Sequence, residues 1–172
     1  MLMISEDRRS APHLKPVPGI IKIRPASVSD VPRMSSLRDT DPDAGPADPR
    51  MVAYLEGRHH PRHALTPRTA YLATVDSGFA GYIAGHLTRR YGCEGEVQYL
   101  YVARGHRRAG VATALLRHLA QWFVENGAAR ICVDVNDDSR GARPFYLSRG
   151  AQQLRPHWIM WSDIKTILAP AQ

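Results

Sequence analysis

The segment VARGHRRAGVA, residues 102–112, combines residue types that bind an anionic group. An apolar run leads into it, a short loop with three arginines follows, and a helical pattern starts at Gly110. Backbone N–H groups at a helix N-terminus lack partners and lie at the positive end of the helix dipole, so they suit a phosphate. Arg107 and Arg108 add charged donors, and the small Gly110 and Ala112 let a pyrophosphate approach the backbone. We therefore expect an anion-binding turn here, although the segment matches neither the Walker A pattern nor G-x-G-x-x-G.

A second set of residues follows this loop in the chain. It consists of Asn136, Ala142, Phe145, Tyr146 and Gly150. Together with the R-x-x-G-x-A pattern of Arg107, Gly110 and Ala112, this set resembles the acetyl-CoA motifs of the GNAT superfamily of N-acetyltransferases. The run EVQYLYV at residues 96–102 likewise resembles the strand that precedes the cofactor loop in that family. Two separate motifs in the right order carry more weight than either one alone.

The resemblance implies both a fold and an activity. The fold is α/β, with a central mixed, mostly antiparallel sheet flanked by helices. We expect one such domain over residues 19–168, preceded by a flexible N-terminal tail at residues 1–18, which is rich in proline and arginine. The activity is transfer of an acetyl group from acetyl-CoA to a primary amine, by direct attack in a ternary complex and without a metal.

The cofactor residues that the resemblance implies lie in the strand before the loop, in the loop itself and in the second motif. They are Tyr101, Val102, Arg107, Arg108, Ala109, Gly110, Val111, Ala112, Asn136 and Ala142. Backbone amides of the turn from Arg107 to Ala112 would hold the pyrophosphate of acetyl-CoA. The strand that ends at Val102 would pair with the pantetheine arm.

Tyr146 and Glu96 are the two catalytic candidates. The departing CoA thiolate needs a proton, and its pKa should lie near that of a cysteine thiol, about 8.5; the resemblance places Tyr146 as the acid that supplies it. An acceptor amine is mostly protonated at neutral pH and must lose a proton before it attacks, and the resemblance places Glu96, the only acid of its strand, as the base. The alternatives are a Tyr146 packed with Phe145 in the core, and a Glu96 exposed with Glu94 at a strand boundary.

The spacing of apolar residues predicts the elements that must position these side chains. Strands are expected at residues 20–23, 70–75, 79–87, 97–103, 131–135, 152–154 and 158–161. Helices are expected at residues 31–37, 51–59, 110–126 and 142–149. The helix at 110–126 has the clearest pattern, with a stop at Gly127. Because Pro144 cannot donate to the carbonyl of Arg140, we expect the last helix either to start late or to kink.

Composition limits the class of protein. The chain has 172 residues and a mass of 19.2 kDa, with 44% apolar and 23% charged residues, which fits one globular domain. Its longest stretch without a charged residue, Ser77 to Thr88, is too short to cross a bilayer, and residues 1–10 hold no apolar signal block. Cys93 and Cys132 are too few for a disulfide framework or a zinc quartet. We therefore expect a cytoplasmic protein without a membrane span.

The net charge of +7 indicates a basic surface, which suits an anionic cofactor and also nucleic acid. A basic nucleic-acid-binding domain is therefore one alternative function, although no recognised motif supports it. A CoA-binding sensor of the same fold, without catalysis, is the other. The expected acceptor is a small-molecule or peptide amine, and a homodimer is left open.

Two clusters of polar residues remain. Four aspartates occupy a proline-rich loop: Asp39, Asp41, Asp43 and Asp48. We expect either an acidic rim that attracts a cationic amine or ordinary turn chemistry. His59, His60 and His63 resemble metal ligands, but no nearby cysteine or aspartate completes the set, so we expect no metal.

Overall fold

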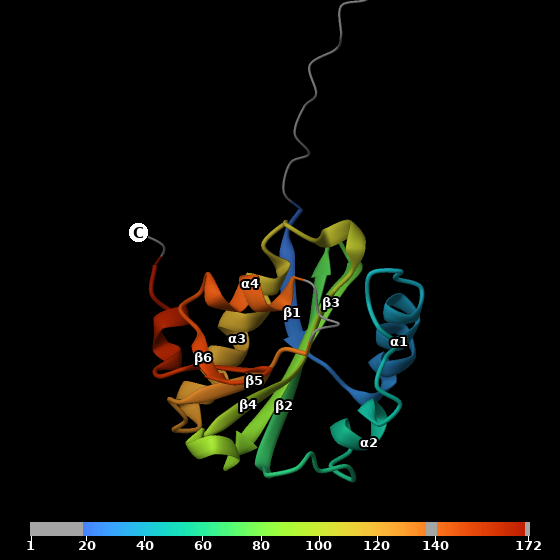
Figure 1. The fold of residues 1–172 in the computed structure, drawn as a ribbon. Coiled ribbons are helices and arrows are strands. Elements are labelled where there is room, and N and C mark those ends of the chain that lie inside the picture. Colours follow the sequence, from blue (N-terminus) through green and yellow to red (C-terminus); the bar gives the residue numbers. More distant parts are fainter. Residues whose placement is uncertain (1–18, 137–140, 171–172) are drawn as a thin grey trace, which may run out of the picture.

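The computed structural model describes residues 19–136 and 141–170, in which seven strands form one mixed sheet (Figure 1). The tail expected at residues 1–18 lies outside the described residues. The strand order is β1-β2-β3-β4-β5-β7-β6, and neighbouring strands are antiparallel except for β4 and β5, which are parallel. The predicted α/β class, with a mostly antiparallel sheet flanked by helices, is confirmed.

The bounds of the elements are as follows. The strands are β1 (Ile21–Pro25), β2 (Ala64–Val75), β3 (Gly78–Thr88), β4 (Gly95–Val102), β5 (Ile131–Asp134), β6 (Gln152–Arg155) and β7 (Trp158–Trp161). The α-helices are α1 (Val31–Asp39), α2 (Met51–Leu55), α3 (Val111–Glu125) and α4 (Ala142–Leu147). Short 3-10 helices are η1 (Val28–Asp30), η2 (Arg90–Gly92), η3 (Arg104–His106) and η4 (Ile164–Ile167).

Strand β2 is longer than the sequence predicts. It begins at Ala64 instead of residue 70, although Pro67 lies inside it. A proline has no N–H to donate to a ladder, and the register between β2 and β3 shifts between Leu65 and Arg68. The strand therefore passes the proline through a local irregularity and then continues.

Helices α2 and α4 both end earlier than predicted, α4 at Leu147 instead of residue 149. Helix α2 ends at Leu55 instead of residue 59, and Gly57 just beyond it adopts a φ of 75°, in which a right-handed helix cannot continue. Helix α4 starts at Ala142, so Pro144 lies in the first turn, where a backbone N–H has no intrahelical acceptor in any case. Pro144 is therefore accommodated without the late helix start or the kink that the sequence led us to expect.

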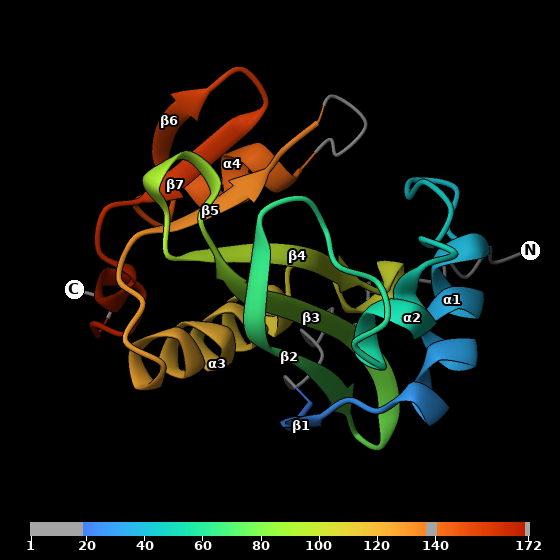
Figure 2. The ribbon, with the colours of Figure 1, turned by 90° about the horizontal axis from the view of Figure 1, so that it is seen from below.

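Helices cover both faces of the sheet (Figures 1 and 2). On one face, α3 buries Leu119 and Phe123 in the larger apolar cluster. On the opposite face, α1 and α2 bury Met34 and Met51 against Tyr101 of β4. Because side chains alternate along a strand, β4 contributes to both layers.

The sheet opens between its two parallel strands. Gly95 to Val97 of β4 pair with Ile131 to Val133 of β5, but β4 continues to Val102. Within the described part of the chain, residues 98–102 have no ladder partner on the β5 side. The two strands diverge from this point (Figure 2).

Among residues 19–136 and 141–170, no helix is both long enough and apolar enough to span a membrane.

Candidate active site

A cleft of about 400 Å³ opens where β4 and β5 part. Its lining comes from β4 and β5, from α4, and from the side of α1 and α2. The lining residues are Arg38, Arg50, Pro61, Arg90, Glu96, Val97, Gln98, Tyr99, Leu100, Val133, Asp134, Asn136, Ala142, Tyr146 and Trp158. The cleft thus brings together both predicted catalytic residues, Glu96 and Tyr146, and two of the predicted cofactor residues, Asn136 and Ala142.

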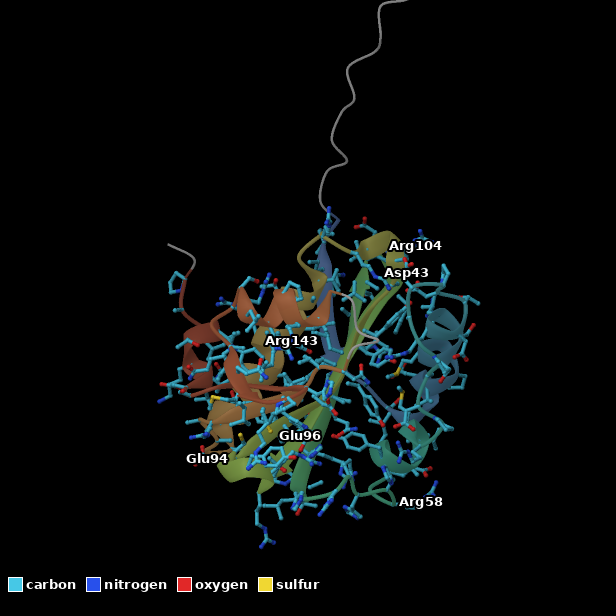
Figure 3. All side chains as sticks on the ribbon, viewed as in Figure 1. Asp43, Arg58, Glu94, Glu96, Arg104 and Arg143 are labelled. Atoms are coloured by element: carbon cyan, nitrogen blue, oxygen red, sulfur yellow. The ribbon has the colours of Figure 1, made fainter. Side chains whose placement is uncertain are left out.

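Glu96 is buried near the start of β4, at the centre of the molecule in Figure 3. Its side chain is 5% exposed, so the alternative of an exposed carboxylate is wrong for Glu96, whereas Glu94 is exposed. Arg90 Nε donates to Glu96 Oε2 at 2.9 Å, and His86 Nε2 lies 3.6 Å from the same oxygen. Burial acts to raise the pKa of Glu96, but the neighbouring His86 and the hydrogen bond from Arg90 outweigh it, so the pKa lies below its ordinary value. The carboxylate is therefore ionised at neutral pH.

His86 and Tyr54 lie behind this carboxylate and were not among the predicted residues. His86 is opposite Glu96 in the β3–β4 register and is fully buried. Its Nδ1 lies 3.0 Å from the hydroxyl of Tyr54, which is also fully buried. A histidine inside the otherwise apolar run at residues 79–87 was the available signal. The role of this histidine becomes visible only from the β3–β4 register, which places it opposite Glu96.

Tyr146 lies on α4 with 3% of its surface exposed. Its ring packs edge-on against Phe145 and Trp161, as the core alternative predicts, and the residue also lines the cleft. Within the described residues its hydroxyl has no hydrogen-bond partner. Burial raises the pKa of Tyr146 well above its ordinary value, so the hydroxyl stays protonated and can donate at any physiological pH.

The turn before α3 presents free backbone donors. Gly110 adopts a φ of 83°, and the first intrahelical bond from this end runs from Ala114 N to Gly110 O at 2.9 Å. The N–H groups of residues 111–113 therefore have no intrahelical acceptor, and no side chain among residues 19–136 and 141–170 caps them. This geometry fits the anion-binding turn that the sequence predicts.

The side chain of Arg107 lies elsewhere than expected. Its Nε donates to the carbonyl of Val102 at 3.1 Å, one terminal nitrogen pairs with Asp41, and the other lies 3.5 Å from Asp43. All three guanidinium nitrogens thus face the loop that follows α1 or the end of β4. The sequence predicted that the Arg107 side chain donates to a phosphate, but in the structure it is bonded within the protein. Arg108, which is exposed beside the turn, is the remaining arginine that could contact a phosphate there.

The aspartates of that loop are mostly bonded within the protein. Asp41 is 2% exposed on its side chain and accepts a hydrogen bond from Tyr101 at 3.0 Å, so an exposed acidic rim is wrong for this residue. Burial acts to raise the pKa of Asp41, but hydrogen bonds from the Asp43 backbone and Tyr101 and the charge of Arg107 lower it overall. Asp48 accepts from Tyr99 at 2.9 Å and from Arg50 at 3.0 Å, and Asp39 accepts from the backbone of Ala47 at 3.0 Å.

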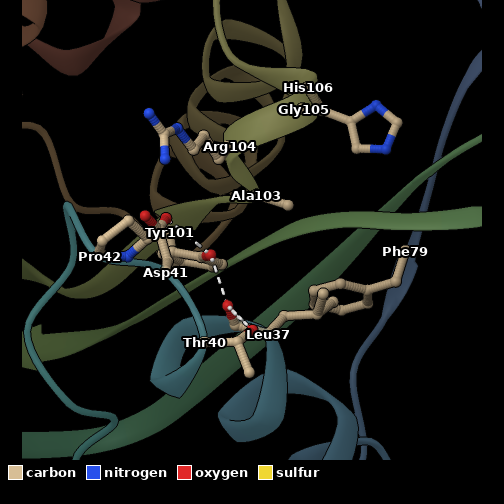
Figure 4. Close-up of a pocket in the computed structure, with 10 residues that line it drawn as sticks. All are labelled: Leu37, Thr40, Asp41, Pro42, Phe79, Tyr101, Ala103, Arg104, Gly105 and His106. Carbon is tan, nitrogen blue, oxygen red and sulfur yellow. Dashed lines mark hydrogen bonds between the residues drawn. The ribbon is translucent and has the colours of Figure 1, made fainter.

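A second cavity, of about 380 Å³, lies between this loop and η3 (Figure 4). Asp41 and Arg104 both line it, and Phe79 and Tyr101 belong to its wall. The side chain of Tyr101, a predicted cofactor residue, therefore belongs to this cavity and to the α1 face. Only its backbone remains available on the edge that β5 leaves free.

Two residues of the histidine cluster contact Arg68. His60 Nδ1 lies 2.7 Å from one terminal nitrogen of Arg68, and the other terminal nitrogen donates to the carbonyl of His59 at 2.8 Å. No three side chains of the metal-ligating types come together in the described part of the chain.

The sheet thus opens beside a helix N-terminus, with a buried acid and a tyrosine in the opening. The model of the acetyltransferase (GNAT) family matches residues 34–151, and the chain belongs to this family. No curated protein matches the chain by sequence.

Solved structures share the fold at low sequence identity. The ribosomal-protein-S18-alanine N-acetyltransferase of Escherichia coli is 18% identical, with a TM-score of 0.60 over 79% of this chain and 80% of that one. Ard1 of Thermoplasma volcanium is 19% identical, with a TM-score of 0.63 over 82% and 95% of the two chains. The GNAT domain of S. lividans PAT is 22% identical, with a TM-score of 0.61 over 81% and 88%.

Proposed function

We propose that this acetyltransferase is an acetyl-CoA-dependent N-acetyltransferase, in which a primary amine attacks the thioester directly within a ternary complex. The observation that carries the proposal is that Glu96 and Tyr146 line one cleft, at the point where β4 loses its partner strand. The similarity to a structure named as an alanine N-acetyltransferase supports an amine acceptor.

Acetyl-CoA would bind along the free edge of β4 and at the turn before α3. The unpaired N–H groups of residues 111–113 suit its pyrophosphate, and Arg108 adds a positive charge beside them. The backbone of residues 98–102, which has no partner on the β5 side among the described residues, suits the amides of the pantetheine arm. These contacts would bring the thioester into the cleft.

The two side chains divide the proton transfers. The ionised Glu96 accepts a proton from the acceptor ammonium, directly or through a water molecule, and the free amine then forms a C–N bond to the acetyl carbon. When the C–S bond breaks, the electron pair leaves with sulfur. The Tyr146 hydroxyl donates its hydrogen to the thiolate and regains the proton that the new amide nitrogen loses, directly or through a water molecule. Because the pKa of Tyr146 is raised, its main contribution is a hydrogen bond that stabilises the developing negative charge.

Cofactor binding is tested by a matched pair of substitutions at Gly110. Asparagine and aspartate are equal in size and both tolerate a positive φ, so they differ mainly in charge. Acetyl-CoA should raise the melting temperature of the wild type and of Gly110→Asn, because it binds the folded state. Gly110→Asp should lose most of this shift through repulsion of the pyrophosphate. Equal shifts in the two variants would contradict binding at this turn.

Catalysis is tested by free CoA release with a panel of primary amines. Tyr146→Phe should lower kcat roughly a hundredfold and leave acetyl-CoA affinity nearly unchanged, as expected for loss of an acid that acts in the transition state. If the protein binds acetyl-CoA but acetylates none of these amines, the result would favour the alternative function of a CoA-binding sensor without catalysis. Binding of duplex nucleic acid with a steep salt dependence would instead favour the alternative of a nucleic-acid-binding domain.

The cytoplasmic location of the protein stays a prediction.

A further inference from the structure

The cleft has a second half, on the side of α1 and α2, that the acetyl-CoA contacts proposed above leave free. Three arginines line the cleft as a whole: Arg38 and Arg50 on this side, and Arg90 beside Glu96. The carboxylates in the lining are Glu96 and Asp134. Which of these charges is free to meet an acceptor decides the chemistry that the cleft can recognise.

Two of the three guanidinium groups already have carboxylate partners. Arg90 donates to Glu96 at 2.9 Å and to the carbonyl of Arg62 at 2.6 Å. Arg50 donates from Nε and a terminal nitrogen to Asp48, at 3.0 and 3.3 Å. Both arginines therefore serve mainly to hold neighbouring acids in place.

Arg38 differs from the other two. Its Nε donates to the carbonyl of Gly45 at 2.8 Å, and no carboxylate pairs with it in the part of the chain that the structure describes. It is half-buried at the end of α1, with its charge 5.8 Å from the ring centre of Tyr101. The guanidinium also lies close enough to Tyr82 to act against the effect of burial on the pKa of that hydroxyl. Its two terminal nitrogens, which pair with no carboxylate among the described residues, form a fork of N–H donors that has the geometry to bind one carboxylate with both oxygens.

The aspartate loop does not favour a cationic acceptor instead. Asp41 is buried against Arg107, and Asp48 is 17% exposed and bonded to Arg50 and Tyr99. Asp43, which is 57% exposed, lies 3.5 Å from Arg104 (Figure 3). The acids that the sequence suggested as a rim are therefore largely neutralised by arginines.

Resting on the proposed function, we propose that the acceptor is an amine that also carries a carboxylate, which Arg38 binds while the amine lies beside Glu96. A half-buried guanidinium without a carboxylate partner gains from a ligand that supplies one, whereas a diamine would place a second cation against it. Arg38 thereby acts as the residue that determines acceptor specificity.

The test uses triplets of small acceptors with the same carbon skeleton. For chains of three to six carbons, each triplet contains an ω-amino acid, its amide and the corresponding diamine. The ω-amino acid of the best length should have a kcat/KM at least about tenfold above its amide, because a charge-assisted bidentate contact is lost in the amide. Tetrapeptides with aspartate or asparagine as the second residue distinguish a free acid from an acidic peptide as the source of the carboxylate.

Arg38→Gln should abolish the preference for the acid, mainly through a raised KM. Arg33→Gln is the matched control, because Arg33 lies on the same helix, is exposed and does not line the cleft. A preference for the diamine, equal rates for acid and amide, or an unchanged preference in Arg38→Gln would overturn the proposal.

A binding measurement keeps the proposal separate from the proposed function. Titration calorimetry on CoA-loaded protein compares the N-acetylated ω-amino acid with its amide, so it needs no turnover. If no amine is acetylated, the proposed function fails, and the calorimetric preference still decides the role of Arg38. Equal affinities for acid and amide would overturn that role.

Discussion

At the scale of single residues, the neighbours of Glu96 decide what this carboxylate can do. Arg90 and His86 keep it ionised although it is buried, and Tyr54 in turn hydrogen-bonds to His86. A carboxylate with a lowered pKa is a weak base. Its action as the proposed proton acceptor therefore depends on holding the ammonium, or a water molecule, by a hydrogen bond at a fixed position. The residue is also a structural one, because it neutralises Arg90, whose side chain is 12% exposed.

We expect Glu96→Gln to destabilise the fold by roughly 3 kcal/mol at pH 7, because it leaves the Arg90 charge unpaired. A lowered pKa means that the stabilisation from the carboxylate is complete above its ordinary pKa of 4.5 and is lost as the pH falls below it. The difference in free energy of unfolding between wild type and variant should therefore be constant from pH 8 to pH 5 and shrink in more acidic solution. Urea unfolding across this range measures it.

Glu56→Gln is the control, because Glu56 pairs with the exposed Arg58 on the surface. It should change the free energy of unfolding by less than about 0.5 kcal/mol at any of these pH values. A Glu96→Gln variant that behaves like this control would contradict the buried pair.

At the scale of elements, the loop after α1 is fastened to the cofactor loop. Asp41 bonds to Arg107 of the cofactor loop and to Tyr101 at the end of β4, and Arg104 lies beside Asp43. The basic loop and the acidic loop, which lie far apart in the sequence, are therefore partners of one another. This contact fixes the α1 side of the molecule relative to the turn before α3.

We expect the two aspartates of this contact to differ in their effect on stability. Asp41→Asn should lower the free energy of unfolding by about 2 kcal/mol, because it removes the charge from a buried, hydrogen-bonded pair. Asp43→Asn should change it by less than about 0.5 kcal/mol, since Asp43 is 57% exposed and 3.5 Å from its partners. Urea denaturation at low and high salt compares them, and equal losses would show that the loop is not fastened through Asp41.

At the scale of the whole molecule, the site depends on how closely β3 approaches β4. Gly81 of β3 is opposite Val102, and a Cβ atom at this position would lie 2.4 Å from the carbonyl oxygen of Tyr101. Glycine at this position therefore lets the two strands pair up to the end of β4, where the cofactor turn begins. A backbone atom cannot move aside as a flexible side chain can.

Gly81→Ala should consequently push β4 away from β3 and lower stability by about 3 kcal/mol, or roughly 10 °C in melting temperature for a chain of this size. Gly45→Ala is the matched control, because nothing lies within 4 Å of its added Cβ, and it should leave the melting temperature within about 2 °C. Thermal unfolding followed by circular dichroism compares the two. Equal melting temperatures would contradict the close approach of the strands.

The local features of this protein followed from its sequence alone. The turn before α3 and the helix itself were predicted, because the apolar stripe that includes Leu115 and Leu119 and the left-handed Gly110 depend on residues close in the chain. The family and the mixed sheet were predicted from two motifs, the cofactor loop and the later set that includes Tyr146, which occur in the order typical of the family. The bounds of β2 and α2 were less accurate, since pairing with β3 carries β2 past Pro67.

The charge partnerships were decided only by the tertiary structure. Glu96 meets His86 through the β3–β4 register, and Arg107 meets Asp41 across 66 residues of chain. Spacing within a segment constrains neighbours up to about four residues away on a helix or two on a strand, so it cannot say which arginine will find which carboxylate. The order of the strands and the packing of α1 over β4 made those choices, and they left Arg38 in the cleft without a carboxylate among the described residues.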